Sequence, residues 1–111
     1  MSKVIEVASK QLEPPDRVQK SYRIGYNRTQ GFIVLTNRKA MVLEERGFFR
    51  PSYHIILEIP YPKVSEVTVE DTHRLAITDT EGKKHVFVSF AEVTASILER
   101  DLKNLIRAVI A

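Results

Sequence analysis

Residues 31–45 constrain the fold more than any other part of the sequence. Residues 32–35 are an apolar run, Thr36-Asn37-Arg38 is polar, and residues 40–43 are a second apolar run. Two short apolar runs around a polar segment predict a β-hairpin, because asparagine tolerates the left-handed backbone geometry of tight turns. The first run is apolar on both faces, so we expect its strand to be covered on both sides or to lie centrally in its sheet.

Further short segments with strand character lie before and after this hairpin. An alternation of apolar and polar residues predicts an earlier strand whose one buried face carries Val18, Tyr22, Ile24 and Tyr26. Residues 27–31 are predicted as a loop whose final glycine supplies the conformational freedom of the turn. Four later segments, separated by residues typical of turns, are predicted as strands over residues 53–59, 64–70, 75–77 and 86–90. The last of these is marked by Val86, Val88 and Phe90.

After residue 90 the hydrophobic period changes from two to the helical value. Ser89 and Glu92 have the spacing of a capping box, and no glycine or proline follows them. Apolar residues then recur over about five helical turns. They are Val93, Ile97, Leu98, Leu102, Leu105, Ile106 and Val109. We expect this amphipathic helix to plug the core of its own β domain rather than to bind a membrane or a partner helix.

Residues 1–16 form an N-terminal arm that ends at Pro14 and Pro15. The apolar residues of the arm fit a short helix or a short strand, and the sequence leaves that choice open. We expect the arm to pack against its own domain. The alternative is an arm that swaps between two copies and dimerises them.

The composition excludes several classes of function. The 111 residues include no cysteine, so disulfides and thiolate metal sites are excluded. His54, His73 and His85 show no metal-ligand spacing, and we predict that they are surface strand or loop residues. Nucleophile-elbow and glycine-rich phosphate-loop motifs are absent from the sequence. We therefore predict no enzyme activity, no cofactor, no metal and no small-molecule substrate.

The location of the protein is constrained by two further features. The N-terminus lacks the apolar core of a signal peptide, because Lys3, Glu6 and Lys10 interrupt it. No apolar run approaches the roughly 20 residues that span a bilayer. We expect a cytoplasmic protein, with peripheral association at a membrane as the alternative.

One motif in the central hairpin resembles a known family. The GRAM, GLUE and bacterial branch of the pleckstrin-homology (PH)-like proteins typically carries Gly-x-Leu-x-Leu-Thr followed by Asn and basic residues. The corresponding stretch here is Gly31-Phe32-Ile33-Val34-Leu35-Thr36-Asn37-Arg38-Lys39. The sequence departs from the pattern at Ile33, where leucine is usual, and at Ala40, where a larger aliphatic residue is common. It also has no tryptophan, which is frequent at the end of the PH helix.

This resemblance, with the order of seven strands and one C-terminal helix, implies a mainly β, PH-like fold. Such a fold is a β-barrel of about seven antiparallel strands in two near-orthogonal sheets, with a C-terminal capping α-helix. The chain would then be a single PH-like domain over residues 1–111. Within it we expect the arm at 1–16, the barrel strands at 17–90 and the helix at 91–110.

The resemblance also implies a candidate binding site. It places the first–second, third–fourth and sixth–seventh strand loops around one mouth of the barrel, whereas counting strands up and down puts the last of these at the opposite end. Six residues at this mouth would bind a lipid headgroup or an acidic partner: Arg28, Phe48, Phe49, Arg50, Lys83 and Lys84. Two phenylalanines beside basic residues suit such a ligand. They suit the protein core equally well, and the sequence does not decide between these interpretations.

The basic residues are distributed unevenly, with no acid between Asp16 and Glu44. Hairpin geometry gathers a second basic patch from Arg17, Lys20, Arg38 and Lys39. Nucleic acid is a weak candidate for this patch, since the sequence has no RNA-binding signature and no DNA-reading helix. A solvated face whose acids come from elsewhere in the fold is the simpler explanation.

The sequence therefore predicts a non-catalytic binding or assembly module. The leading hypothesis is protein–protein interaction, including self-association, because the doubly apolar strand and the arm offer apolar surface to a partner. The alternative is peripheral binding to anionic membrane lipid headgroups through the loops at the barrel mouth.

Overall fold

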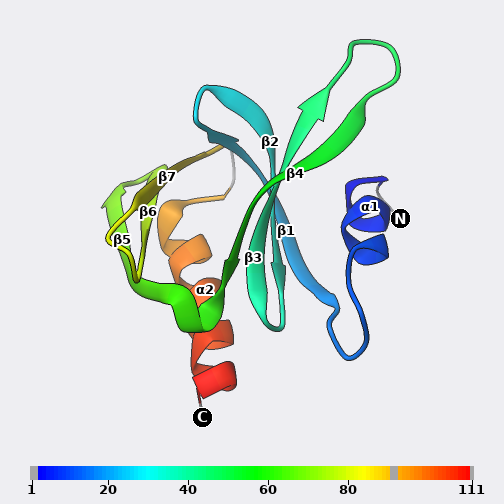
Figure 1. The fold of residues 1–111 in the computed structure, drawn as a ribbon. Coiled ribbons are helices and arrows are strands. Elements are labelled where there is room, and N and C mark those ends of the chain that lie inside the picture. Colours follow the sequence, from blue (N-terminus) through cyan, green and yellow to red (C-terminus); the bar gives the residue numbers. More distant parts are fainter. Residues whose placement is uncertain (1–2, 91–92, 111) are drawn as a thin grey trace.

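The computed structural model describes residues 3–90 and 93–110 of the chain. These residues form seven β-strands, one short 3₁₀ helix and two α-helices (Figure 1). In chain order they are α1 (Lys3–Lys10), β1 (Val18–Tyr26), β2 (Thr29–Thr36), β3 (Lys39–Arg46), β4 (Ser52–Pro60), η1 (Tyr61–Lys63), β5 (Val64–Asp71), β6 (Arg74–Asp79), β7 (Lys84–Ser89) and α2 (Ala95–Ile110).

All seven strands belong to one antiparallel sheet, in the order β4-β3-β2-β1-β7-β6-β5. β1 joins the two halves of this sheet, because it pairs with β2 along its length but with β7 only through Ile24, Gly25 and Tyr26. Figure 1 shows β5, β6 and β7 as a layer beside the other four strands, with α2 running between the two layers. The predicted fold class, antiparallel strands with one C-terminal helix, is confirmed.

The main apolar core lies between these two layers. All seven strands contribute side chains to it, and α2 adds Ala95, Leu98 and Leu102. β4 and β5 are the two edges of the sheet and do not pair, so the barrel is open between them. Helix α2 packs against β5, β6 and η1. Tyr61 of η1 is fully buried and donates its hydroxyl to the carbonyl oxygen of Thr36 at 2.6 Å, which ties this open side to β2.

A second apolar cluster lies on the outer face of β2 and β3. Val34, Met41 and Leu43 are fully buried there, and α1 covers them with Val4 and Ala8. Figure 1 shows α1 and α2 on opposite sides of the strands. The prediction that the strand at residues 32–35 is covered on both sides is confirmed, and so is the packing of the arm against its own domain.

A β-bulge in β1 changes which face of the strand is buried. The register of β1 against β2 shifts between Val18 and Lys20. Tyr22 and Ile24 face the main core, whereas Val18 packs in the outer cluster. The prediction of one buried face is therefore wrong at the start of this strand, because the extra residue of a bulge reverses the alternation.

A second bulge has the same effect in β4. The register shifts where Val42 pairs with Leu57 and Leu43 pairs with Ile55. Leu57 packs against the main core and Ile55 against the outer cluster, although both are odd-numbered. One edge strand thus contributes to both apolar clusters.

The connection between β1 and β2 is shorter than predicted. Asn27 and Arg28, with φ values of 51° and 65°, form the turn, and β2 begins at Thr29. Gly31 lies inside β2 rather than in a loop. A Cβ atom at this position would lie 1.9 Å from the carbonyl oxygen of Leu43 on β3. Gly31 is needed for the close approach of two backbones, not for turning the chain.

The last strand buries the face opposite to the predicted one. His85, Phe87 and Ser89 are buried, whereas Val86 and Val88 are half-buried. Phe90, predicted in the strand, lies just beyond it and is exposed. Because residues 86–88 are apolar throughout, hydrophobicity does not distinguish the two faces of this segment.

The C-terminal helix begins later than predicted, at Ala95. Thr94 precedes it and accepts the backbone N–H of Ile97 on its side-chain oxygen at 3.4 Å. The predicted capping box includes Glu92, which lies outside the described residues.

One buried polar contact joins α2 to β1. Tyr22 donates its hydroxyl to the Oδ2 of Asp101, which is itself buried. Burial and this hydrogen bond raise the pKa of Tyr22 to about 12.

We expect Gly31→Ala to lower the free energy of unfolding by about 3 kcal/mol, because the backbone of β3 must move to admit the methyl group. Gly25→Ala is a matched control in β1, where the new Cβ would lie at ordinary contact distance, 3.6 Å, from Phe90. Its effect should stay within about 1 kcal/mol. Urea unfolding of the two variants measures the difference, and equal losses would contradict the assigned role of Gly31.

Tyr22 should contribute a stabilisation that disappears at alkaline pH. Its folded-state pKa, about 12, lies above the ordinary tyrosine value of 10.0, so the contribution is complete below about pH 10 and is lost as the pH rises through 12. Near neutral pH, Tyr22→Phe should cost about 1.5–3 kcal/mol, the typical worth of a hydrogen bond to a charged group. Urea unfolding of both proteins should show this difference shrinking above pH 10; a constant difference would argue against the Tyr22–Asp101 contact.

Candidate functional site

The hairpin of β3 and β4 extends beyond the rest of the sheet. β2 pairs with β3 only as far as Gly31 opposite Glu44, whereas β3 and β4 pair as far as Arg46 opposite Ser52. Residues 47–51 connect the two strands. Figure 1 shows this hairpin projecting away from the body of the molecule. The connecting residues, called the hairpin tip below, therefore have no second layer to pack against.

Phe48 and Phe49 lie in the hairpin tip and are 95% and 96% exposed. Their ring centroids are 6.2 Å apart. Of the two interpretations that the sequence left open, the structure supports exposure at the surface and not burial in the core. Two adjacent exposed phenylalanines form a larger apolar surface than the scattered single residues that are ordinary on proteins.

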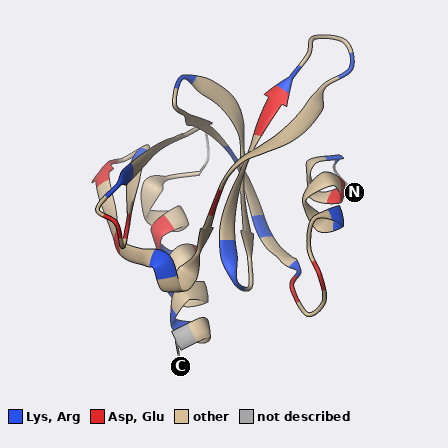
Figure 2. Ribbon diagram, viewed as in Figure 1, with Lys and Arg blue, Asp and Glu red and all other residues tan. Residues whose placement is uncertain are grey.

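Arg46 and Arg50 lie on either side of the two phenylalanines in the chain, and Figure 2 shows Lys or Arg positions near the end of the projecting hairpin. Arg46 forms an ion pair with Glu44, and Arg23 lies 3.6 Å from Glu45. Arg50 has no acidic partner among the residues that the structure describes. Arg50 is left unpaired among these residues because Glu44 pairs with Arg46 and Glu45 pairs with Arg23 of β1.

Aromatic packing holds the stem of the hairpin. Tyr53 of β4 makes an edge-on contact with Phe32 of β2, with centroids 6.0 Å apart. The guanidinium of Arg23 lies 5.0 Å from the centroid of the Phe32 ring. Each contact of these kinds contributes roughly 0.5–1.5 kcal/mol. The tip is therefore presented on an ordered stem.

The turns β1–β2 and β6–β7 form a separate group. Lys83 and Lys84 line a hollow of about 360 Å³ together with Tyr26 and Asn27, and Arg28 follows Asn27 in the turn. These two turns lie close together. The family resemblance implied this proximity, whereas counting strands up and down put the β6–β7 turn at the opposite end. Figure 1 shows the hairpin tip projecting elsewhere. The predicted site thus falls into two groups: Phe48, Phe49 and Arg50, and Arg28, Lys83 and Lys84.

Acids from other elements neutralise much of the second predicted basic patch. Arg38 pairs with Asp16 at 2.9 Å, and Lys39 pairs with Glu58 at 2.8 Å. This supports the simpler explanation, a solvated face. For the other two residues of this patch the structure gives no side-chain ion pair among the described residues. Arg17 donates its backbone N–H to Asn37, and Lys20 lines a small hollow beside α2.

His85 is buried, contrary to the prediction that all three histidines lie at the surface. Its Nδ1 is 3.0 Å from the Tyr26 hydroxyl, and its Nε2 is 3.2 Å from Oδ2 of Asp79. A carboxylate only accepts hydrogen bonds. The imidazole therefore donates one from Nε2 to Asp79 and, in the neutral tautomer, accepts one at Nδ1 from the Tyr26 hydroxyl. His85 shares the buried face with Phe87 and Ser89, and the sequence carried no signal for this choice because Val86 and Val88 mark the other face equally well.

Asp79 holds the β6–β7 turn through its other oxygen. Oδ1 accepts the backbone N–H groups of Glu81 and Lys83, each at 3.0 Å. Hydrogen bonds, foremost that from the Lys83 backbone, hold the pKa of Asp79 below its usual value, while burial raises the pKa of Tyr26. The chain Tyr26–His85–Asp79 thus connects β1 to the β6–β7 turn through satisfied hydrogen bonds.

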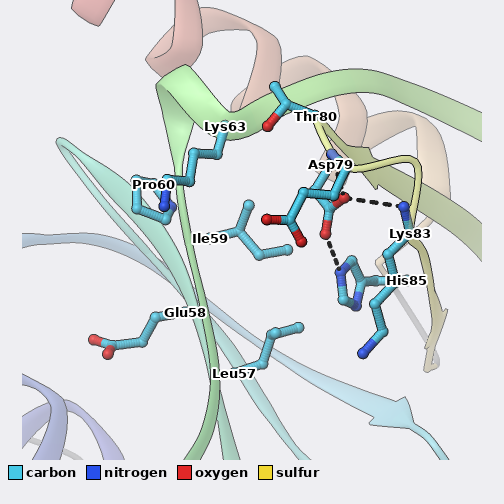
Figure 3. Close-up of a pocket in the computed structure, with 10 residues that line it drawn as sticks. Leu57, Glu58, Ile59, Pro60, Lys63, Asp79, Thr80, Lys83 and His85 are labelled. Carbon is cyan, nitrogen blue, oxygen red and sulfur yellow. Dashed lines mark hydrogen bonds and ion pairs between the residues drawn. The ribbon is translucent and has the colours of Figure 1, made fainter.

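A cleft of about 290 Å³ lies on the open side of the barrel (Figure 3). One wall is formed by residues 57–60 of β4 and by Lys63, and the other by Asp79, Thr80, Glu81, Lys83 and His85. Figure 3 shows Leu57 and Ile59 reaching across the cleft toward His85 and Asp79. The sequence did not indicate this cleft, because its walls come from segments that are distant along the chain.

No group of three or more His, Cys, Asp or Glu side chains in residues 3–90 and 93–110 is placed to hold a metal ion. Within the same residues, neither helix has the length and apolar character needed to cross a membrane.

Three solved structures share this fold, and two of them are described as pleckstrin-homology domains. The C-terminal domain of an unknown protein from Leishmania infantum matches with a TM-score of 0.72 at 9% identity, over 94% of this chain and 95% of that one. A pleckstrin-homology domain from Shewanella amazonensis matches with a TM-score of 0.62 at 17% identity, over 99% and 98% of the two chains. A DUF1696 family protein with a pleckstrin-homology domain, from Shewanella loihica, matches with a TM-score of 0.61 at 14% identity over 93% of each chain.

These likenesses show that the fold is PH-like. No protein-family model matches the sequence, and no curated protein is significantly similar to it. Assignment to the GRAM and GLUE branch stays a prediction.

His85→Ala should lower the free energy of unfolding by about 1–3 kcal/mol, because it leaves the buried Tyr26 hydroxyl and an oxygen of Asp79 without their partner. His54→Ala is the matched control, since His54 is exposed, and its effect should stay within about 0.5 kcal/mol. Adding Tyr26→Phe to the wild type and to His85→Ala completes a double-mutant cycle, read by urea unfolding. A coupling energy of about 0.5 kcal/mol or more is expected, and zero coupling would mean that the two side chains do not interact.

Proposed function

We propose that the chain is a non-catalytic PH-like module that binds peripherally to anionic membranes through the tip of the β3–β4 hairpin. The near-complete exposure of Phe48 and Phe49 carries this proposal. An apolar pair beside a basic residue gains free energy at a bilayer surface in two ways, by burial of the rings and by attraction to anionic headgroups.

Self-association, which was part of the leading hypothesis from the sequence, has less support than the sequence suggested. It relied on apolar surface offered by the doubly apolar strand and by the arm. In the structure these two surfaces pack against each other within one chain, through Val34, Met41, Val4 and Ala8. The main apolar surface that remains for a partner is the hairpin tip.

The shape of the tip favours a bilayer over a protein as its partner. A narrow projecting turn enters a fluid interface without requiring a matching surface, whereas a protein partner must supply a preformed pocket for each ring. A protein with such a pocket is the competing explanation that the experiment below separates from the membrane.

The apolar contribution should exceed the electrostatic one. Full burial of one phenylalanine is worth about 1.5–3 kcal/mol, so partial burial of both gives roughly 3 kcal/mol, or about 100-fold in affinity. One basic residue near an anionic surface adds about 1 kcal/mol. Since Arg46 is already paired with Glu44, Arg50 is the main basic residue expected to act at the tip.

Co-sedimentation with vesicles of mixed neutral and anionic phospholipid tests the proposal at low salt. We expect the wild-type protein to bind, and the double variant Phe48→Ser with Phe49→Ser to bind about 100-fold more weakly. Arg50→Gln should weaken binding roughly fivefold and reduce its dependence on salt.

Phe90→Ser provides the control, because Phe90 is an exposed phenylalanine outside the tip and its removal should leave vesicle binding unchanged. A wild-type protein that stays in solution with anionic vesicles would overturn the membrane proposal and leave a protein partner for the tip. Equal binding by the wild type and the double serine variant would instead exclude the tip as the binding surface.

A further inference from the structure

Residues from both faces of β4 line the cleft on the open side of the barrel. Leu57 and Ile59 belong to the main core, whereas Glu58 and Pro60 are exposed on the other face, yet all four border the same cavity. Successive side chains of a strand point to opposite faces, so both sets can meet one cavity only where it runs along the strand's edge. β4 is an end strand of the sheet, and the cleft therefore follows its unpaired edge.

The backbone of β4 presents hydrogen-bonding groups to this cleft. Tyr61 donates its backbone N–H to Arg38 at 3.0 Å, and this pair continues the antiparallel register of β3 and β4. In such a ladder the backbone N–H and C=O groups of alternate residues point toward the partner strand. Those of the odd-numbered residues 57 and 59 therefore point toward β3. The N–H and C=O of Glu58 then face the cleft, together with the C=O of Pro60, which has no N–H to leave unpaired.

The opposite wall limits what can enter. The β6–β7 turn and His85 close the cleft on the far side, held by the Asp79 hydrogen bonds. These walls favour one extended segment over the sheet edge of a second folded domain, because such a segment needs only the space of a single strand, about 4.8 Å from its neighbour.

The charges at the rim select an acidic segment. Glu58 is paired with Lys39, and Asp79 is engaged by His85 and the turn backbone. Lys63 and Lys83 have no acidic partner among the described residues, and the exposed Glu81 offsets only one of them. Lys63 and Lys83 therefore offer two ammonium groups that no described side chain pairs, whereas the carboxylates of Glu58 and Asp79 are already engaged.

We propose that this cleft binds an extended acidic peptide segment of a protein partner. The segment adds to β4 as a strand through the backbone N–H and C=O of Glu58. One apolar side chain lies on Leu57 and Ile59 beside His85, and neighbouring acidic side chains meet Lys63 and Lys83. In this mode of recognition main-chain hydrogen bonds supply affinity and the side-chain pocket supplies specificity. The site is independent of the hairpin tip, which lies at the other end of β4.

The test uses a fluorescein-labelled peptide of alternating valine and glutamate, with fluorescence anisotropy as the readout. Two comparison peptides separate the contributions: one of alternating valine and lysine, and one of valine and glutamate with N-methylated amides, which cannot donate backbone hydrogen bonds. We expect the first peptide to bind at least tenfold more tightly than either of the others. Its binding should shift the NMR signal of the Glu58 amide and slow the hydrogen exchange of that amide.

The double variant Lys63→Glu with Lys83→Glu should reduce affinity for the acidic peptide at least tenfold. Lys3→Glu with Lys10→Glu makes the same change of charge on α1, away from the cleft, and should alter the affinity little. No binding of the valine–glutamate peptide at millimolar concentration would overturn the proposal. Undiminished binding of the N-methylated peptide, or shifts confined to the hairpin tip, would overturn it too.

Discussion

The burial of β2 and β3 on both faces is the constraint on which the rest of the structure depends. A strand that is apolar on both sides needs two separate covers, because successive side chains point in opposite directions. Here the second layer of strands and α2 cover one face, and the short helix α1 covers the other. Gly31 lets the two strands approach closely at the point where β2 ends its pairing and the β3–β4 hairpin continues alone.

This arrangement also determines which surfaces remain for partners. Because α1 occupies the outer face of β2 and β3, the apolar surface that the sequence offered for self-association is already used within the chain. The two surfaces proposed for partners lie along β4: its beginning supports the exposed phenylalanines, and its end borders the cleft. β4 can serve both because it is an edge strand with a bulge, and its two halves contribute to different apolar clusters.

The candidate surfaces were less predictable than the fold. The sequence singled out Phe48 and Phe49 but left their exposure open, because exposure depends on how far β3 and β4 extend beyond β2. That distance is set by where the pairing with β2 stops, at Gly31, and nothing local to residues 48 and 49 encodes it. His85 was assigned to the surface for a related reason: its strand is apolar on both faces, so only the pairing of β7 with β1 and β6 decides which face is buried.

The sequence by itself determined the number and order of the strands, the terminal helix and the two-sided burial of the strand at residues 32–35. These follow from local periodicity and turn residues, which act over a few neighbouring positions, whereas the PH-like class was implied by the resemblance of the hairpin motif to a known family. Tertiary structure alone decided the shift of faces at the two bulges, the exposure of the hairpin tip, the Tyr26–His85–Asp79 chain and the cleft beside β4. Each of these depends on which distant segments become neighbours, and that is settled by packing and register, not by the residues adjacent in the chain.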